Sequence, residues 1–169
     1  MVSIFGLFKF EDWLTPSLTC PTQPWRSRKL RRTKKPVQTK NSDPLLFSIW
    51  AGLQRSFFNE REDLLDYEIL WSVRRQKRVL ASITYKDKRV RVAKELNHPD
   101  YVQLLEPLLY HEMCHAVLGA SVEKRNGKRL WHGSKFKQLE RLHPGSNLLD
   151  QWIRTGGWLR AIRRDRARR

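Results

Sequence analysis

The first recurring pattern of apolar residues follows Asp43-Pro44, a pair typical of a helix start. Aspartate can cap the first turn of a helix, and the fixed backbone of proline suits its first position. Apolar residues then recur at the three- and four-residue spacing of one helix face. These residues are Leu46, Ile49, Trp50, Leu53 and Phe57. The spacing predicts an amphipathic helix that packs on a sheet.

Strand patterns come next in the chain. Apolar and polar residues alternate over Glu68 to Arg74 and again over Val79 to Tyr85, which is the two-residue period of a half-buried strand. Lys86-Asp87-Lys88 then predicts a turn into a third strand around Val90 and Val92. The three segments predict a small, mostly antiparallel sheet with at least three strands.

A longer apolar pattern predicts a central helix that begins near Pro99-Asp100 and stops at Gly119. Pro107 either kinks this helix or marks a fresh start within it. Two later segments, Leu148 to Ile153 and Trp158 to Ile162, predict short helices. Strands and helices in this order indicate an α+β fold.

The predicted central helix contains His111-Glu112-Met113-Cys114-His115, a complete H-E-x-x-H motif. Residues four apart lie on one helix face, about 6 Å apart along the axis, so His111 and His115 can aim ring nitrogens at one cation. Glu112 lies about 100° further around the helix, from where its carboxylate can reach an activated water without binding the metal. The motif predicts a hydrolytic zinc centre that needs a third ligand from elsewhere.

The third ligand decides the class of zinc site. Its candidates are His132, Glu140 and His143. A metzincin would need glycine at position 118 and histidine at 121, where this chain has Leu118 and Ser121, and Ser121 also weakens a metal-nuclease hypothesis. His132 is favoured, because it precedes a short predicted helix that Phe136 can anchor in the core. Glu140 as the ligand would instead give a gluzincin-like site.

The two histidine motifs resemble those of the SprT-like (Spartan-type) zinc metalloprotease domain. H-E-M-x-H at residues 111–115 pairs with H-G-x-x-F at residues 132–136. Leu46-Phe47, Phe57-Phe58-Asn59 and Trp71-Ser72-Val73-Arg74 agree with the resemblance further upstream. It covers roughly residues 44 to 143 and is most specific at the two histidine motifs.

The resemblance implies a zincin-like α+β fold and the hydrolysis of peptide bonds, with DNA-associated proteins as expected substrates. The zinc ligands that it implies are His111, His115 and His132. Glu112 would act as the general base toward a zinc-activated water. Many members of the family also carry a four-cysteine zinc ribbon. Cys20 and Cys114 are the only cysteines in this sequence, which therefore does not contain that module.

Charge adds a second signal, because 34 lysines and arginines face 17 aspartates and glutamates, a formal net charge of +17. We predict a disordered, basic, proline-rich N-terminal arm over residues 1–43, the metalloprotease domain over residues 44–160, and a basic C-terminal tail over residues 161–169. Each phosphate contact releases counterions, so such an excess of cations favours polyanions. DNA or RNA, bound through its backbone, is the expected partner of the arm and the tail.

A non-proteolytic alternative remains, in which the three histidines only anchor the fold of a zinc-stabilised nucleic-acid-binding module.

Two cysteines far apart in the sequence favour a reducing compartment. No segment approaches the roughly 18 consecutive apolar residues that a membrane span needs. We therefore expect a cytoplasmic protein, associated with the nucleoid if it binds DNA.

Overall fold

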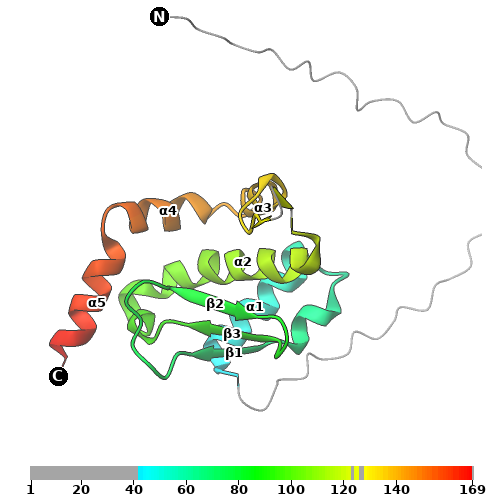
Figure 1. The fold of residues 1–169 in the computed structure, drawn as a ribbon. Helices are drawn as coiled ribbons and strands as arrows, with labels where there is room; N and C mark the ends of the chain where they lie inside the picture. Colours follow the sequence, from blue (N-terminus) through cyan, green and yellow to red (C-terminus); the bar gives the residue numbers. More distant parts are fainter. Residues whose placement is uncertain (1–41, 123, 126–127, 169) are drawn as a thin grey trace, which may run out of the picture. The chain divides into compact units, whose positions relative to one another are not determined.

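The computed structural model describes residues 42–122, 124–125 and 128–168 (Figure 1). The elements in chain order are α1 (Pro44–Phe57), η1 (Glu62–Asp66), β1 (Glu68–Trp71), β2 (Ala81–Thr84), β3 (Arg89–Val92), η2 (Lys94–Leu96), η3 (Pro99–Tyr101), α2 (Val102–Leu118), η4 (Gly119–Ser121), β4 (Lys124–Arg125), β5 (Lys128–Arg129), α3 (Ser134–Glu140), α4 (Ser146–Arg154) and α5 (Gly157–Ala167). The α+β class is confirmed. The N-terminal arm predicted over residues 1–43 lies outside the described residues apart from its last two, so the arm stays a prediction.

Asp43 fixes the start of α1 and ties this helix to the sheet. Its Oδ1 accepts hydrogen bonds from the backbone N–H groups of Leu45 and Leu46, at 3.0 and 3.1 Å. Its Oδ2 accepts a hydrogen bond from the indole N–H of Trp71 at 3.0 Å, and its own N–H donates to the carbonyl of Ile69 at 2.9 Å. One carboxylate therefore caps the helix and joins it to β1.

Three strands form one sheet in the order β1-β3-β2. β3 pairs with β1 in parallel, with Ile69 opposite Val90, and with β2 antiparallel, with Ile83 opposite Val90. The sheet is therefore mixed, whereas the alternating pattern favoured mostly antiparallel pairing. The loop between Trp71 and Ala81 leads from β1 to β2, and these two strands do not pair with each other. The chain then turns into β3, which lies between β1 and β2 and pairs with both. Alternation indicates which face is buried but not the direction of the neighbouring strand.

The central helix α2 contacts α1, β2, α3 and α4, and Figure 1 shows it between the sheet and the layer of α3 and α4. Most of its side chains from Leu104 to Ala116 are buried. The helix is continuous through Pro107 and does not start afresh there. It ends at the predicted stop, where Gly119 has φ +44°, a left-handed conformation that favours glycine.

The C-terminal segment of the described chain is helical. The sequence predicts a basic tail from residue 161, but α5 continues through to Ala167. Trp158, Ala161 and Ile162 are buried on one face of this helix, which holds it against the domain. The basic residues of the predicted tail are therefore carried on a packed helix. No helix within the described residues is long and apolar enough to cross a membrane.

Replacing Asp43 tests the link between α1 and the sheet. We expect Asp43→Ala to lower the free energy of unfolding by about 1–3 kcal/mol, because the helix loses its cap and Trp71 loses its acceptor. Asp43→Asn keeps an oxygen acceptor and should lose less. Urea unfolding followed by circular dichroism measures both variants, and an unchanged midpoint for Asp43→Ala would contradict the proposed role.

Candidate metal centre

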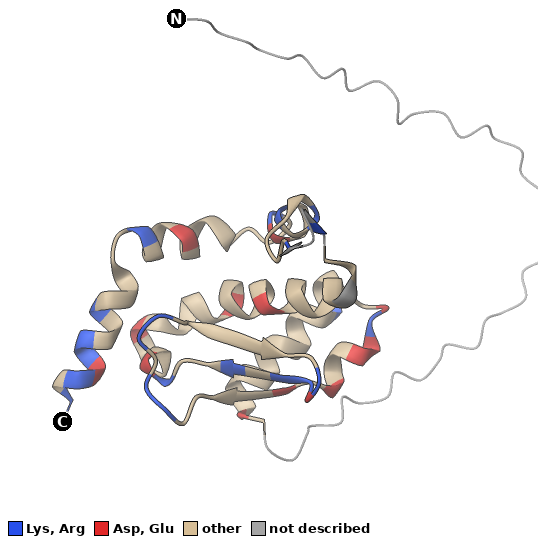
Figure 2. Cartoon of the chain, viewed as in Figure 1, with Lys and Arg blue, Asp and Glu red and all other residues tan. Residues whose placement is uncertain are grey.

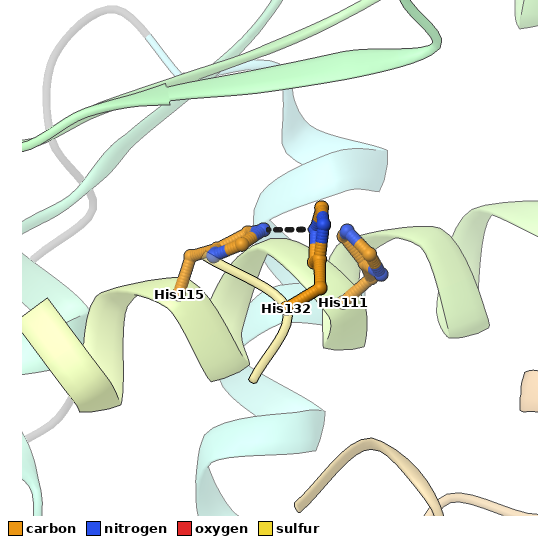
Figure 3. A group of neighbouring side chains, drawn as sticks. All are labelled: His111, His115 and His132. Atoms are coloured by element: carbon orange, nitrogen blue, oxygen red, sulfur yellow. Dashed lines mark hydrogen bonds between the residues drawn. The ribbon is translucent and has the colours of Figure 1, made fainter. Parts of the chain in front are cut away.

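Two histidines of the site come from one face of α2. His111 and His115 are four residues apart, and their ring centroids lie 5.0 Å apart. Both project from the helix toward the same space (Figure 3). The helical spacing predicted from the sequence therefore brings the two imidazoles together.

The third histidine, His132, comes from the segment that joins β5 to α3. Each of His111, His115 and His132 has a ring nitrogen that lies within 4.8 Å of a ring nitrogen of the other two. Phe136 of α3 is 2% exposed, and its ring packs against all three imidazoles, with centroid distances of 4.4 to 4.9 Å. The phenyl ring thus forms an apolar floor that holds the three histidines in one cluster.

The nitrogens of this cluster suit a shared metal ion. The Nε2 atoms of His115 and His132 face each other at 3.1 Å (Figure 3). Two nitrogens that each lie about 2.0–2.1 Å from a tetrahedral zinc are about 3.3 Å apart, close to the observed separation. His132 is exposed and His111 half-buried, so solvent can reach this side of the cluster.

The environment favours the neutral form of two of these imidazoles, those of His115 and His132. Burial, followed by the charges of His111 and His132, lowers the pKa of His115 to about 4. Burial and the charge of His111 also lower the pKa of His132. A neutral imidazole offers a nitrogen lone pair, whereas a protonated one cannot bind a metal. Burial therefore favours the forms of His115 and His132 that can bind a metal.

Glu140 orients one of the histidines. Its Oε1 accepts a hydrogen bond from Nδ1 of His111 at 2.6 Å, and this bond is the main cause of the lowered pKa of the Glu140 carboxyl. An ionised carboxylate on Nδ1 keeps the proton there and leaves Nε2 of His111 free to bind a metal. The structure thus places Glu140 behind a histidine of the cluster and not within the cluster.

His143, the last candidate for the third ligand, lies elsewhere. Its Nδ1 accepts a hydrogen bond from the backbone N–H of Gly145 at 3.0 Å, and its Nε2 lies 3.4 Å from Oε1 of Glu106. Its ring packs against Phe57 and Tyr110. His143 is therefore a buried histidine that stabilises the junction between α3 and α4.

Glu112 is the buried carboxylate of the site. It is 5% exposed, and burial raises its pKa to about 7, although the charge of His111 opposes the rise. Burial also raises the pKa of Tyr85, and the charges of Tyr67 and Glu112 add to that rise. A carboxyl group that titrates near neutrality can both accept and release a proton under physiological conditions.

The segment that carries His132 is held from two sides. Trp131 stacks on Tyr85 at the end of β2, with ring centroids 6.0 Å apart, and lies 6.4 Å from the ring of His115. On the other side, the hydroxyl of Tyr110 in α2 donates a hydrogen bond to the carbonyl of Leu139 in α3 at 2.8 Å. These contacts fix the third histidine relative to the other two.

Sequence reasoning did not identify the roles of Glu140, Tyr85 and Trp131. One signal for Glu140 was available, since Phe136 and Glu140 are four residues apart on α3 and so share the helix face that meets α2. No comparable signal joins Tyr85 to Trp131, because they lie 46 positions apart and meet only through the fold.

Comparison with known proteins identifies the family of the chain. No curated protein and no solved structure matches it. The model of the SprT-like family matches residues 47–144, nearly the span over which the sequence resembled this family. The matched segment includes Glu112 and all three clustered histidines, and the α+β fold agrees with the zincin-like fold expected for the family. Since the match covers more than half of the 169 residues, the chain belongs to the SprT-like family.

Proposed function

We propose that the protein is a zinc-dependent metallopeptidase in which three histidines hold the ion and Glu112 moves the proton. The observation that carries this proposal is the convergence of three imidazoles, two of them kept neutral by burial, next to a buried carboxylate with a pKa of about 7. Membership of the SprT-like family supports it. A cluster of imidazoles and a nearby carboxylate that titrates near neutrality are both typical of sites for metal-assisted hydrolysis.

The donor set fits zinc in a catalytic site. Nε2 of His111, His115 and His132 would provide three nitrogen ligands, which leaves a fourth position for substrate or water. The hydrogen bond from His111 to Glu140 would strengthen the first of these ligands. When bound, zinc acts as a Lewis acid that polarises a carbonyl group and lowers the pKa of water toward neutrality.

Glu112 supplies the proton transfers of the proposed reaction. Water must lose a proton as its oxygen forms a bond to the peptide carbonyl carbon, and the Glu112 carboxylate accepts this proton. The same oxygen of Glu112 returns the proton to the peptide nitrogen as the C–N bond breaks, which releases an amine. A pKa of about 7 suits both steps, because the group is a stronger base than an ordinary carboxylate and still a competent acid.

The strand β2 offers a place for the peptide substrate. It lies at one edge of the sheet and contacts the helix that carries Glu112. The outward backbone groups of an edge strand can pair with an extended peptide. A peptide paired with Ala81 to Thr84 would end beside Tyr85 and Trp131, next to the histidine cluster. We therefore propose extended or unfolded protein segments as the substrates.

Glu112→Gln tests the proton transfer. We expect the variant to keep its fold and its zinc but to lose about 10²–10⁴-fold in kcat for hydrolysis of an unfolded protein, because an amide cannot accept the proton. Glu106→Gln on the same helix is the control, since Glu106 is exposed and faces His143. Elemental analysis measures zinc, and gel electrophoresis follows cleavage.

Two results would contradict the assigned role. Full activity in purified Glu112→Gln would remove Glu112 from the proton transfers. Wild-type protein that binds zinc and nucleic acid but cleaves neither unfolded proteins nor peptides would favour the non-proteolytic module.

The third ligand is tested by comparing two histidines. We expect His132→Ala to lose stoichiometric zinc while retaining its circular dichroism spectrum, because two imidazoles bind zinc too weakly to survive dialysis against a mild chelator. His143→Gln should keep one zinc per chain, since His143 lies outside the cluster. Elemental analysis after dialysis separates the two, and a folded His132→Ala protein that still holds one zinc would refute the assignment.

The role of Glu140 is tested by the strength of zinc binding. Glu140→Gln should weaken zinc binding about 10–100-fold without abolishing it, since His111 loses an ionised acceptor but remains a ligand. Competition with a chromophoric chelator measures the dissociation constant. Unchanged affinity would show that the hydrogen bond does not support the site, and complete loss of zinc would instead make Glu140 a ligand.

A further inference from the structure

Two basic segments lie next to each other at the end of the domain where α5 is found. The loop of residues 73–78 between β1 and β2 contains four cations and no acid: Arg74, Arg75, Lys77 and Arg78. The C-terminal helix and the residue after it contain five arginines and one aspartate: Arg160, Arg163, Arg164, Arg166 and Arg168, with Asp165. Figure 2 shows these segments as neighbouring groups of basic residues.

Direct contacts join the loop to α5. Arg75 forms an ion pair with Asp165, with Nε 2.8 Å from Oδ2, and its Nη2 donates a hydrogen bond to the carbonyl of Asp165 at 3.2 Å. The indole N–H of Trp158 donates to the carbonyl of Lys77 at 3.3 Å. Lys77 and Arg166 also line the same cavity of about 200 Å³. The two segments therefore form one continuous surface.

The nearby acids are already used inside this surface. Asp165 is paired with Arg75, and Oε1 of the buried Glu95 accepts a hydrogen bond from the backbone N–H of Gln76 at 2.6 Å. Arg164 pairs with Asp100 at the side of the helix. Within the described residues, the exposed cations that form no ion pair on this surface are Arg74, Lys77, Arg78, Arg160, Arg163, Arg166 and Arg168.

One group of acids lies in a different part of the domain. Residues 60–68, around η1, contain five acids and a single arginine. Nearby cations neutralise three of these acids through the pairs Arg61–Asp63, Lys88–Asp66 and Arg89–Glu68. A surface whose charge only kept the protein soluble would mix both signs over all faces. Figure 2 shows the cations of loop 73–78 and α5 at the end of the domain away from η1, while further basic residues lie on β4, β5 and α3.

We propose that loop 73–78 and α5 together form a surface that binds the phosphodiester backbone of nucleic acid. Arginine dominates the surface, and its planar guanidinium can donate two parallel hydrogen bonds to a phosphate. Binding through the backbone would be independent of base sequence. This inference extends the proposed function by a partner and does not depend on peptidase activity.

An anionic membrane fits this surface less well. A helix that lies on a membrane inserts a continuous apolar stripe, but the stripe of α5 formed by Trp158 and Ile162 is buried against the domain. Val73 and Leu159 are exposed but stand as single apolar side chains among the cations. The phosphates of nucleic acid require no apolar insertion and match the charge.

The experiment compares two triple variants of the full chain. Arg74→Gln/Arg78→Gln/Arg163→Gln removes three exposed cations from the surface. Arg55→Gln/Lys86→Gln/Arg141→Gln removes three exposed cations from other parts of the domain and is the matched control. Both triples have the same net charge and the same N-terminal segment. Fluorescence anisotropy measures binding to a labelled 20-base-pair duplex DNA at several salt concentrations.

We expect the surface triple to bind the duplex about ten- to a hundredfold more weakly than wild type at 0.1 M salt. Its slope of log K against log salt should be smaller by about 2–3, since each lost phosphate contact removes about 0.9. The control triple should change neither quantity by more than about twofold. A single-stranded RNA of similar length should show the same difference between the triples if the backbone alone is recognised.

Three outcomes would overturn the proposal. An equal loss of DNA affinity in both triple variants would show that DNA binding depends only on the total charge of the protein. Unchanged binding in the surface triple, or no binding of duplex by wild type, would remove this surface as a nucleic-acid site. Binding to phosphatidylserine vesicles that the surface triple alone weakens, with DNA binding unaffected, would assign the surface to a membrane.

Discussion

The structure depends on holding the segment of His132 against α2, because imidazoles from two separate segments can share an ion only if their nitrogens are positioned to within about 0.5 Å. His111 and His115 meet this requirement through helix geometry alone, because they lie four residues apart on α2. His132 needs tertiary contacts. These are the packing of Phe136 against the imidazoles, the stacking of Trp131 on Tyr85 and the hydrogen bond from Tyr110 to α3.

The burial of α2 has a second consequence, which is electrostatic. The low polarity around the helix disfavours every charge on it, so the same burial keeps His115 neutral and raises the pKa of Glu112 toward neutrality. Metal binding requires a histidine nitrogen with a free lone pair, and proton transfer requires a carboxylate that can hold a proton near neutral pH. Burial favours both of these states. Glu140, on the neighbouring helix α3, behaves differently, since its hydrogen bond from His111 lowers its pKa and keeps it ionised.

The two proposed activities occupy different parts of the domain. The histidine cluster lies between α2 and α3, where the buried Phe136 ring packs against the three imidazoles. The basic surface lies on α5 and loop 73–78, where exposed arginines dominate. Such a separation allows nucleic acid to be held without competing with a peptide for the metal. Trp158 and Ile162 pack α5 against the domain, so its arginines are held in a fixed arrangement.

The sequence by itself determined the features that depend on neighbours along the chain. These are the capped start of α1, the stop of α2 at Gly119, the pairing of His111 with His115, and the choice of the SprT-like family. Only the tertiary structure decided which distant residues meet. It placed β3 between β1 and β2, brought His132 to the cluster while Glu140 supports His111 and His143 lies apart, and continued the predicted tail as α5. The physical reason is that helical and strand periods report which face is buried, whereas contacts across the fold depend on the packing of all elements at once.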